Sequence, residues 1–213
     1  MFYAGITQDD ETFCQVQSIF EVSTLNDMSK EDGETYEEYV TMGKFRVEKE
    51  FSVASIVYHP DFLDKNTHMG KMHLEYLQYL DKFPEKKEDF LKAVKFLASE
   101  FAKPVADDKR YEYKISAAFT KIVLAFGLSG VLYPSVKGEG KGFNIAIDPS
   151  YIKNKILRLE KLAVWRLQKR NKNLFIEPYL YCETFGNDGR FIWQDAKVYV
   201  PAMEAEKVLN RES

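Results

Sequence analysis

A change in hydrophobic spacing midway along the chain constrains the fold more than any other sequence feature. Between residues 69 and 127, apolar residues recur every three to four positions, which predicts helices over residues 69–83, 86–102 and 114–127. From Gly130 onward, short runs rich in branched and aromatic residues alternate with turn residues, as in strands. These segregated patterns predict an α+β protein, with helices packed on a mixed or antiparallel sheet.

The segments on either side of the three helices complete this prediction. A helix is expected over residues 13–25, an exposed acidic loop over 26–38, and a brief helix from Pro149 to about residue 156. Strands are expected at Phe2–Ile6, 41–47, 52–58, 130–133 and 143–147, with a C-terminal β-meander at 157–169, 174–185 and 190–200. The predicted division is a domain of residues 1–156 and a β extension, 157–213, packed on it.

Composition narrows the function classes. Of the 213 residues, 30 are basic and 33 are acidic, so a net charge of -3 gives no general reason to expect binding to nucleic acid or to an anionic membrane. No apolar run reaches the roughly 18 residues of a membrane span. Two cysteines are too few for a disulfide framework, which predicts a reducing, cytoplasmic location. Aromatic residues reach 15% of the chain, and they suit flat ring ligands.

The stretch with the clearest chemical potential surrounds Ser135. This serine follows a predicted buried strand and precedes a loop that contains Gly138, Gly140 and Gly142. Its hydroxyl can donate to a phosphate or ribose oxygen, and glycine backbone N–H groups can approach an anion closely. A β-turn with a flexible loop is the alternative interpretation, and spacing alone favours that alternative.

Two segments in this stretch resemble the C-terminal motif of RES-domain proteins, a family named for its Arg, Glu and Ser. They are residues 130–135 (GVLYPS) and 142–147 (GFNIAI). Residues 1–5 and 43–47 are also similar to family segments, so the resemblance covers about residues 1–149 with gaps.

The resemblance implies an ADP-ribosyltransferase-like fold and a toxin of a toxin–antitoxin pair. It implies cleavage of the nicotinamide–ribose bond of NAD⁺, by phosphorolysis or by ADP-ribosyl transfer to a protein. NAD⁺ is then a substrate, no metal is expected, and a helix-turn-helix antitoxin is the implied protein partner. A homodimer is one option for the assembly.

The resemblance assigns roles residue by residue. Ser135 matches the family Ser and is expected to hold the phosphate or ribose. Tyr3 matches a strand Tyr and is expected to touch the nicotinamide end. Asn144 matches the Asn of the closing strand, where ligand binding and a structural role are equally expected. Glu21 is favoured as the catalytic carboxylate, with two competitors that stay open: Gln15, which would mean that the carboxylate is lost, and Glu11.

No residue matches the family Arg, which precedes the Tyr strand; Arg46 belongs to a different strand. Without it, the pyrophosphate loses a bidentate partner. Three explanations are open: a chain that begins inside the domain, which is ranked first because residue 2 already has a strand pattern, a substitute such as Lys137 or Lys141, or a domain without catalysis. The last makes a catalytically inactive nucleotide- or protein-binding module the alternative function.

Other candidate sites are discounted. His68 and His73 lie five residues apart, which matches one helix face poorly and favours surface or boundary histidines over a metal site. Cys14 and Cys182 are expected to be buried apolar residues. The basic stretch 166–172 has aromatic neighbours, a combination that can bind RNA, but a charged hairpin is the favoured interpretation.

Overall fold

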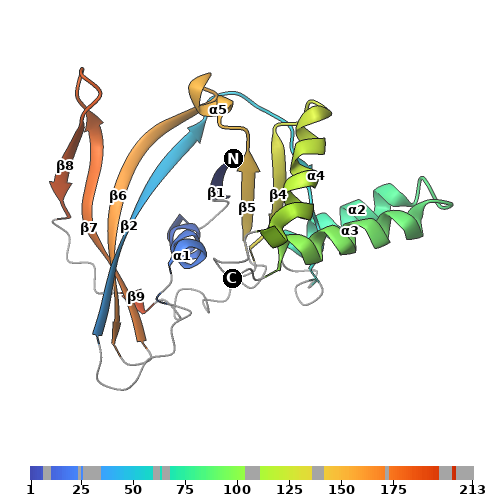
Figure 1. Ribbon diagram of the computed structural model, residues 1–213, viewed down its shortest axis with the longest axis horizontal. Helices are drawn as coiled ribbons and strands as arrows, with labels where there is room; N and C mark the ends of the chain where they lie inside the picture. The colour runs from blue at the N-terminus through green and yellow to red at the C-terminus, as the bar shows by residue number, and fades with distance from the viewer. Residues whose placement is uncertain are drawn as a thin grey trace. The chain divides into compact units, whose positions relative to one another are not determined.

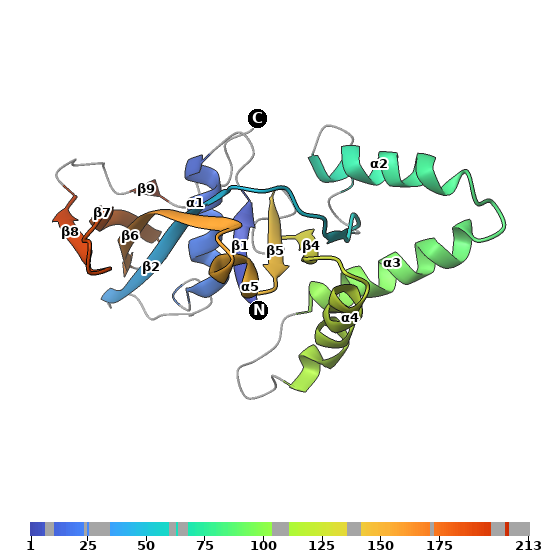
Figure 2. The ribbon, with the colours of Figure 1, turned by 90° about the horizontal axis from the view of Figure 1, so that it is seen from above.

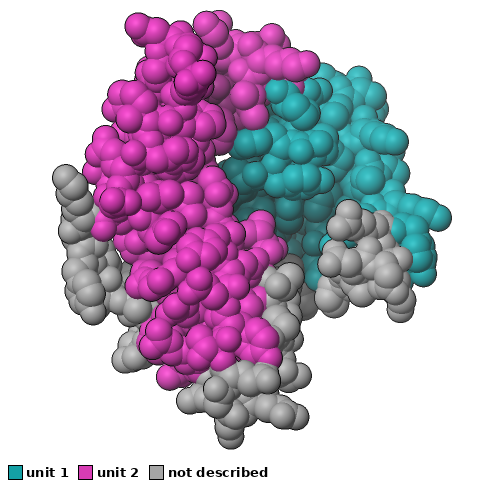
Figure 3. All heavy atoms as spheres, turned by 60° about the vertical axis from the view of Figure 1, so that its left-hand side comes forward, with its two compact units in different colours: residues 1–9, 51–149 teal, residues 10–50, 150–213 magenta. Residues whose placement is uncertain are grey.

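The computed structural model describes residues 1–6, 11–23, 25, 35–59, 63, 68–103, 111–135, 142–170, 173–196 and 203–204. These residues form an α+β protein (Figure 1). The chain divides into two compact units, coloured separately in Figure 3. Unit 1 comprises Met1–Asp9 and Phe51–Pro149, and unit 2 comprises Asp10–Glu50 and Ser150–Ser213. Each unit is assembled from two separate segments, whereas the sequence division at residue 156 is continuous; that division stays a prediction.

Unit 1 is built around a four-stranded sheet with the order β1-β5-β4-β3. The strands are β1 (Phe2–Ile6), β5 (Phe143–Ile147), β4 (Gly130–Pro134) and β3 (Ala54–Ser55). Neighbours are antiparallel except β3 and β4, which run parallel, so the sheet is mixed. All five residues of β5 are buried, as expected for an inner strand covered on both faces.

The helices of unit 1 are α2 (His68–Leu80), α3 (Lys87–Phe101) and α4 (Lys114–Ala125). Figure 2 shows α2 and α3 diverging from the turn that joins them, with α4 beside β4. Gly127, just beyond α4, has a φ of 81°, the left-handed conformation that commonly follows a helix and favours glycine. The core between α3, α4 and the sheet consists of Ile56, Val94, Ala98, Val123 and Val131.

Unit 2 contains an antiparallel sheet with the order β2-β6-β7-β8, and a short strand β9 that also pairs with β7. The strands are β2 (Thr35–Val47), β6 (Leu157–Arg170), β7 (Asn173–Phe185), β8 (Phe191–Asp195) and β9 (Met203–Glu204). The short helix α5 (Ser150–Lys153) precedes β6. The three strands of the predicted C-terminal meander are present as β6, β7 and β8, with residues 197–200 of the last one outside the described residues, and β2 extends the sheet at one edge.

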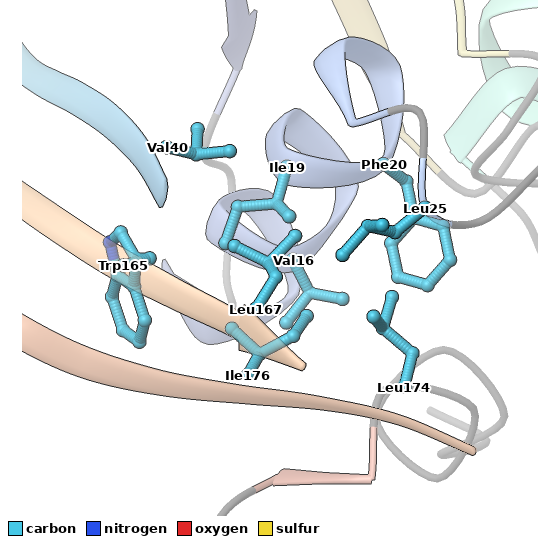
Figure 4. Packing of buried hydrophobic residues seen from close by; sticks show 9 residues of the cluster. All are labelled: Val16, Ile19, Phe20, Leu25, Val40, Trp165, Leu167, Leu174 and Ile176. Carbon is cyan, nitrogen blue, oxygen red and sulfur yellow. The ribbon is translucent and has the colours of Figure 1, made fainter. Parts of the chain in front are cut away.

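Helix α1 (Glu11–Val22) covers one face of this sheet (Figure 4). Ile19 and Leu167 are fully buried there, and each such side chain stabilises the fold by roughly 1.5–3 kcal/mol. The core consists of Val16, Ile19, Phe20, Leu25, Val40, Trp165, Leu167, Leu174 and Ile176. The other face of the β2–β6–β7 sheet carries the exposed side chains.

The α+β class and the mixed and antiparallel sheets are confirmed, and likeness to ADP-ribosyltransferases stays a prediction. Two local predictions are wrong. Within the predicted loop 26–38, residues 35–38 are strand because they pair with residues 167–170 of β6, and residues 26–34 lie outside the described residues. Glu38 lies on the inner face of this strand, where its Oε2 accepts a 2.7 Å hydrogen bond from the hydroxyl of Ser23. The predicted strand 52–58 is reduced to Ala54–Ser55, since only these residues pair with β4.

Candidate functional site

The residues that carry the RES resemblance meet on the sheet of unit 1. Tyr133 of β4 pairs directly with Asn144 of β5, and Asn144 pairs on its other side with Gly5 of β1. Directly paired residues of antiparallel strands project from the same face. The two motif segments are therefore hydrogen-bonded neighbours, and their Tyr and Asn form one row across the sheet.

Tyr3 and Ser135 lie at opposite ends of this face. Tyr3 is two residues from Gly5 and pairs with Ala146, which pairs in turn with Val131. Ser135 lies four residues beyond Val131 along the β4 direction, so two strand spacings and four residue rises separate it from Tyr3, roughly 16 Å in all. That separation excludes a direct catalytic pair.

Burial differs sharply among these residues. Tyr3 lies on the edge strand β1 and is 66% exposed, whereas Ser135 is 0% and Asn144 9% exposed. The Ser135 backbone N–H donates to the Gly142 carbonyl at 2.9 Å, which extends the β4–β5 ladder by one step. Of the three, only the Tyr3 ring is openly available to a ligand, and the burial of Asn144 favours the structural role that the sequence left open.

Tyr133 anchors this row to the helical layer. Its ring lies 5.1 Å from that of Phe101 on α3, and the Phe101 ring lies 6.1 Å edge-to-face from Phe119 on α4. These aromatic contacts fix β4 against α3 and α4. They also leave the β1 end of the face, where Tyr3 projects, as its exposed part.

The remaining predicted site residues belong to unit 2 or lie outside the described residues. Glu21 and its competitor Gln15 are half-buried residues of α1, in unit 2, and Glu11 is the first residue of the same helix. Lys137 and Lys141 lie outside the described residues. The role of Glu21 as the catalytic carboxylate stays a prediction.

Arg46 is engaged elsewhere, as its position in the sequence suggested. It belongs to β2 in unit 2, and its Nε lies 2.6 Å from Oε1 of Glu160 on the neighbouring strand β6. Among the described residues, Arg46 therefore forms an ion pair between two strands of unit 2.

Sequence reasoning missed a hydrogen-bonded cluster on the open face of the unit 2 sheet. Glu37 accepts two hydrogen bonds, from Gln168 Nε2 at 2.7 Å and from the Tyr39 hydroxyl at 2.8 Å. These bonds, the Gln168 one foremost, lower the pKa of Glu37, and the bond to Glu37 raises the pKa of Tyr39. Residues 35–38 were predicted as a loop; Tyr36, followed closely by Tyr39 and Val40, was the available indication of a strand.

Arg166 completes this cluster. Its Nη2 forms an ion pair with Glu177 Oε1 across β6 and β7, which raises the pKa of Arg166. The Tyr39 ring packs edge-to-face on Tyr179 with centroids 5.1 Å apart. Cross-strand pairs of this kind stabilise an open sheet face, and the cluster has that explanation without a ligand.

The strand pairing of the predicted charged hairpin is confirmed, and residues 171 and 172 lie outside the described residues. Arg170 at the end of β6 pairs with Asn173 at the start of β7, and its guanidinium lies 5.9 Å from the Phe175 ring. Trp165 is only 8% exposed and belongs to the core under α1. Of the two aromatic neighbours of this basic stretch, Trp165 is therefore not available for stacking on a base.

The histidines and cysteines have structural surroundings. His68 packs edge-to-face on Phe143, whereas His73 is buried with its Nδ1 2.7 Å from the Val57 carbonyl oxygen. His73 is thus a core residue and not the surface or boundary residue expected. Both cysteines are buried, as predicted, and free. Within the described ranges, no group of three or more His, Cys, Asp or Glu side chains is placed to hold a metal ion.

Among the helices in the part of the chain that the structure describes, none has both the length and the apolar character needed to cross a membrane.

Comparison with known proteins identified no relative: no family model, no curated protein and no solved structure matches the chain.

Proposed function

We propose that the chain binds NAD⁺ at the exposed β1 edge of the unit 1 sheet, where Tyr3 projects, and cleaves its nicotinamide–ribose bond. The observation that carries the proposal is the pairing of Tyr133 with Asn144, which brings the two segments of the RES-like motif together. Tyr3 supports it further, since its ring is 66% exposed at the open end of the same face. An exposed aromatic ring suits stacking against nicotinamide.

Cleavage of the nicotinamide–ribose bond requires few catalytic groups from the protein. The bond between ribose C1′ and the nicotinamide nitrogen breaks, and nicotinamide leaves as a neutral molecule with the bonding electron pair. An oxygen of phosphate or a nucleophilic side chain of a protein acceptor then bonds to C1′. The transition state has oxocarbenium character, which a carboxylate stabilises electrostatically. The resemblance assigns this carboxylate to Glu21, and a Glu21→Gln variant tests the assignment by itself.

A second candidate function is NAD⁺ binding without turnover. The complete burial of Ser135 favours it, because a fully buried hydroxyl fixes the β4–β5 turn as readily as it holds a phosphate. The protein would then be a RES-like binding module. A helix-turn-helix antitoxin partner and a cytoplasmic location belong to the same proposal; the free thiols of Cys14 and Cys182 support a reducing compartment.

The test measures nicotinamide release from NAD⁺ by chromatography, with and without phosphate, alongside NAD⁺ binding by calorimetry. We expect release from the wild-type chain, a loss of at least about tenfold in Tyr3→Ala, and a comparable loss in Glu21→Gln. Tyr79→Ala is the matched control, since Tyr79 is another tyrosine of unit 1 that is 55% exposed, on α2.

Each outcome has one meaning. Release that Tyr3→Ala abolishes and Tyr79→Ala leaves intact supports the enzyme. Binding without release supports the module. If the chain neither binds nor cleaves NAD⁺, both functions are rejected.

A further inference from the structure

Helix α4 buries one side and leaves a second apolar side uncovered. Thr120 and Val123 are 7% and 5% exposed, and Phe119 packs against Phe101 of α3. Ile115 and Ile122, by contrast, are 40% and 53% exposed. The sequence groups residues 115, 118, 119 and 122 on one face; in the structure Phe119 turns into the core while Ile115 and Ile122 remain outside.

The uncovered side continues to the end of the helix. Phe126 is 82% exposed, and its N–H still donates to the Ile122 carbonyl at 3.0 Å, so it prolongs the last turn. At about 100° per residue, positions 115, 118, 122, 125 and 126 fall within about 100° of one another around the helix. Ala118 and Ala125 separate the large residues. We call these five residues the α4 stripe.

The α4 stripe has the form of a helix-docking seam. Its spacing of three, four and seven residues is that of a helix face that packs against another helix. The two alanines leave room for a partner backbone, and Ile115, Ile122 and Phe126 provide the apolar contacts. Single exposed apolar residues need no explanation, but three at this spacing on one helix form a continuous surface.

The charge beside the stripe selects the partner. Lys114 and Lys121 are exposed and seven residues apart, so they lie on the same rim, separated by roughly 10 Å along the helix. Helix α4 contains no Asp or Glu, although the whole chain has a net charge of -3. The opposite rim is the side on which Phe119 and Val123 pack. A ligand on the stripe therefore meets positive charge on one rim only.

We propose that the α4 stripe binds an amphipathic helix of another protein, with apolar residues against Ile115, Ile122 and Phe126. Its acidic residues, repeated every seven positions, lie against Lys114 and Lys121. A second copy of this chain fits less well, since two α4 helices would bring four lysines together and no carboxylate. An anionic lipid surface also fits less well, because two lysines on a twelve-residue helix supply little of the charge that such binding needs.

The test uses two designed helical peptides that share one heptad pattern of leucines and differ only in flanking Glu or Lys residues. Binding to the purified full chain is measured by fluorescence anisotropy at low salt. We expect the Glu peptide to bind at least about tenfold more tightly than the Lys peptide. Lys121→Glu, which leaves one positive and one negative charge on the rim, should abolish that preference.

Variants locate the binding surface. Ile122→Ser should weaken binding of the Glu peptide by about tenfold or more. Phe96→Ser on α3 is the matched control, because Phe96 is 51% exposed and lies off the stripe; it should leave binding unchanged. If Ile122→Ser fails to fold by circular dichroism, Phe126→Ser carries the same test.

Four results would overturn the proposal. The first two are equal binding of both peptides and no binding of either. The third is a dimer in analytical ultracentrifugation that Ile122→Ser dissociates, which would assign the stripe to a second copy. The fourth is binding to phosphatidylserine vesicles that Ile122→Ser abolishes while the Glu peptide does not compete, which would assign the stripe to a lipid surface.

Discussion

The two sheets of this protein differ in how many of their faces bury apolar side chains. In unit 1, β5 lies between β1 and β4, and all five of its residues are buried. In unit 2, β2 alternates, with Val40 in the core and Tyr39 and Thr41 exposed on either side of it in the sequence. Strand β5 is therefore covered on both faces, whereas β2 is covered on one.

This difference determines where each unit tolerates change. A strand closed on both faces has no position at which a larger side chain projects into solvent. A strand with one open face tolerates change at every second residue, and there cross-strand pairs replace packing. The comparison predicts that neighbouring positions in unit 2 differ strongly in sensitivity, and that neighbouring positions in β5 do not.

The largest expected effect concerns the packed face of unit 2. Leu167 is fully buried under α1, so Leu167→Ala should lower the free energy of unfolding by about 3 kcal/mol. Its neighbour Gln168 projects from the open face, and Gln168→Ala should cost about 0.5 kcal/mol. Urea denaturation followed by tryptophan fluorescence measures both, because both tryptophans, Trp165 and Trp193, belong to unit 2. Equal effects would contradict the one-sided burial of β6.

A smaller effect concerns overpacking in unit 1. Ala146 in β5 is 3% exposed and shares its face with Asn144, so Ala146→Leu should cost about 2 kcal/mol. Thr41→Leu, at an exposed position of β2, should be nearly neutral. Circular dichroism at 222 nm reports mainly on unit 1, which contains α2, α3 and α4, and tryptophan fluorescence reports on Thr41→Leu in unit 2. An unchanged unfolding midpoint for Ala146→Leu would show that this face of β5 has free space.

The sequence predicted correctly those helices whose bounds follow from the spacing of their own apolar residues. Helices α2, α3 and α4 begin and end within three residues of the predicted bounds, because their apolar spacing is a local property. Glu38 misled the prediction of β2, since its inward position depends on Ser23, fifteen residues away in the chain. When the hydrogen-bond partner of a carboxylate is distant in the chain, the local sequence shows only an acidic residue, which is typical of a loop.

The candidate site divides in the same way. The pairing of Tyr133 with Asn144 follows from two adjacent motif segments, so the sequence could predict that they meet. The burial of Ser135 and the exposure of Ile122 could not be predicted, because both depend on which surface another element covers. The spacing of apolar residues predicts which side chains share one face of a helix. It does not predict which face another element covers.

The smallest expected effect concerns pH and the open face of unit 2. The pKa of Glu37 is lowered below its ordinary 4.5 by hydrogen bonds from Gln168 and Tyr39. The unfolded chain therefore binds more protons than the folded chain in this range. The stability that Glu37 contributes is present above pH 4.5 and is lost as the pH falls through its lowered folded pKa.

Tyr39 acts at the other end of the pH scale. Its hydroxyl donates to Glu37, so its pKa is raised above 10.0, and its contribution is present below pH 10 and lost as the pH rises through the folded value. Tyr39→Phe should remove this alkaline dependence and weaken the acid one. Tyr179→Phe keeps the ring contact with Tyr39 and should leave the acid dependence unchanged, while it reduces the alkaline one only slightly, because Tyr179 is a minor cause of the raised pKa of Tyr39. Urea midpoints at pH 3, 7 and 11 test this. A pH profile unaltered by Tyr39→Phe would show that the open face contributes no linked stability, leaving unit 2 dependent on its packed face alone.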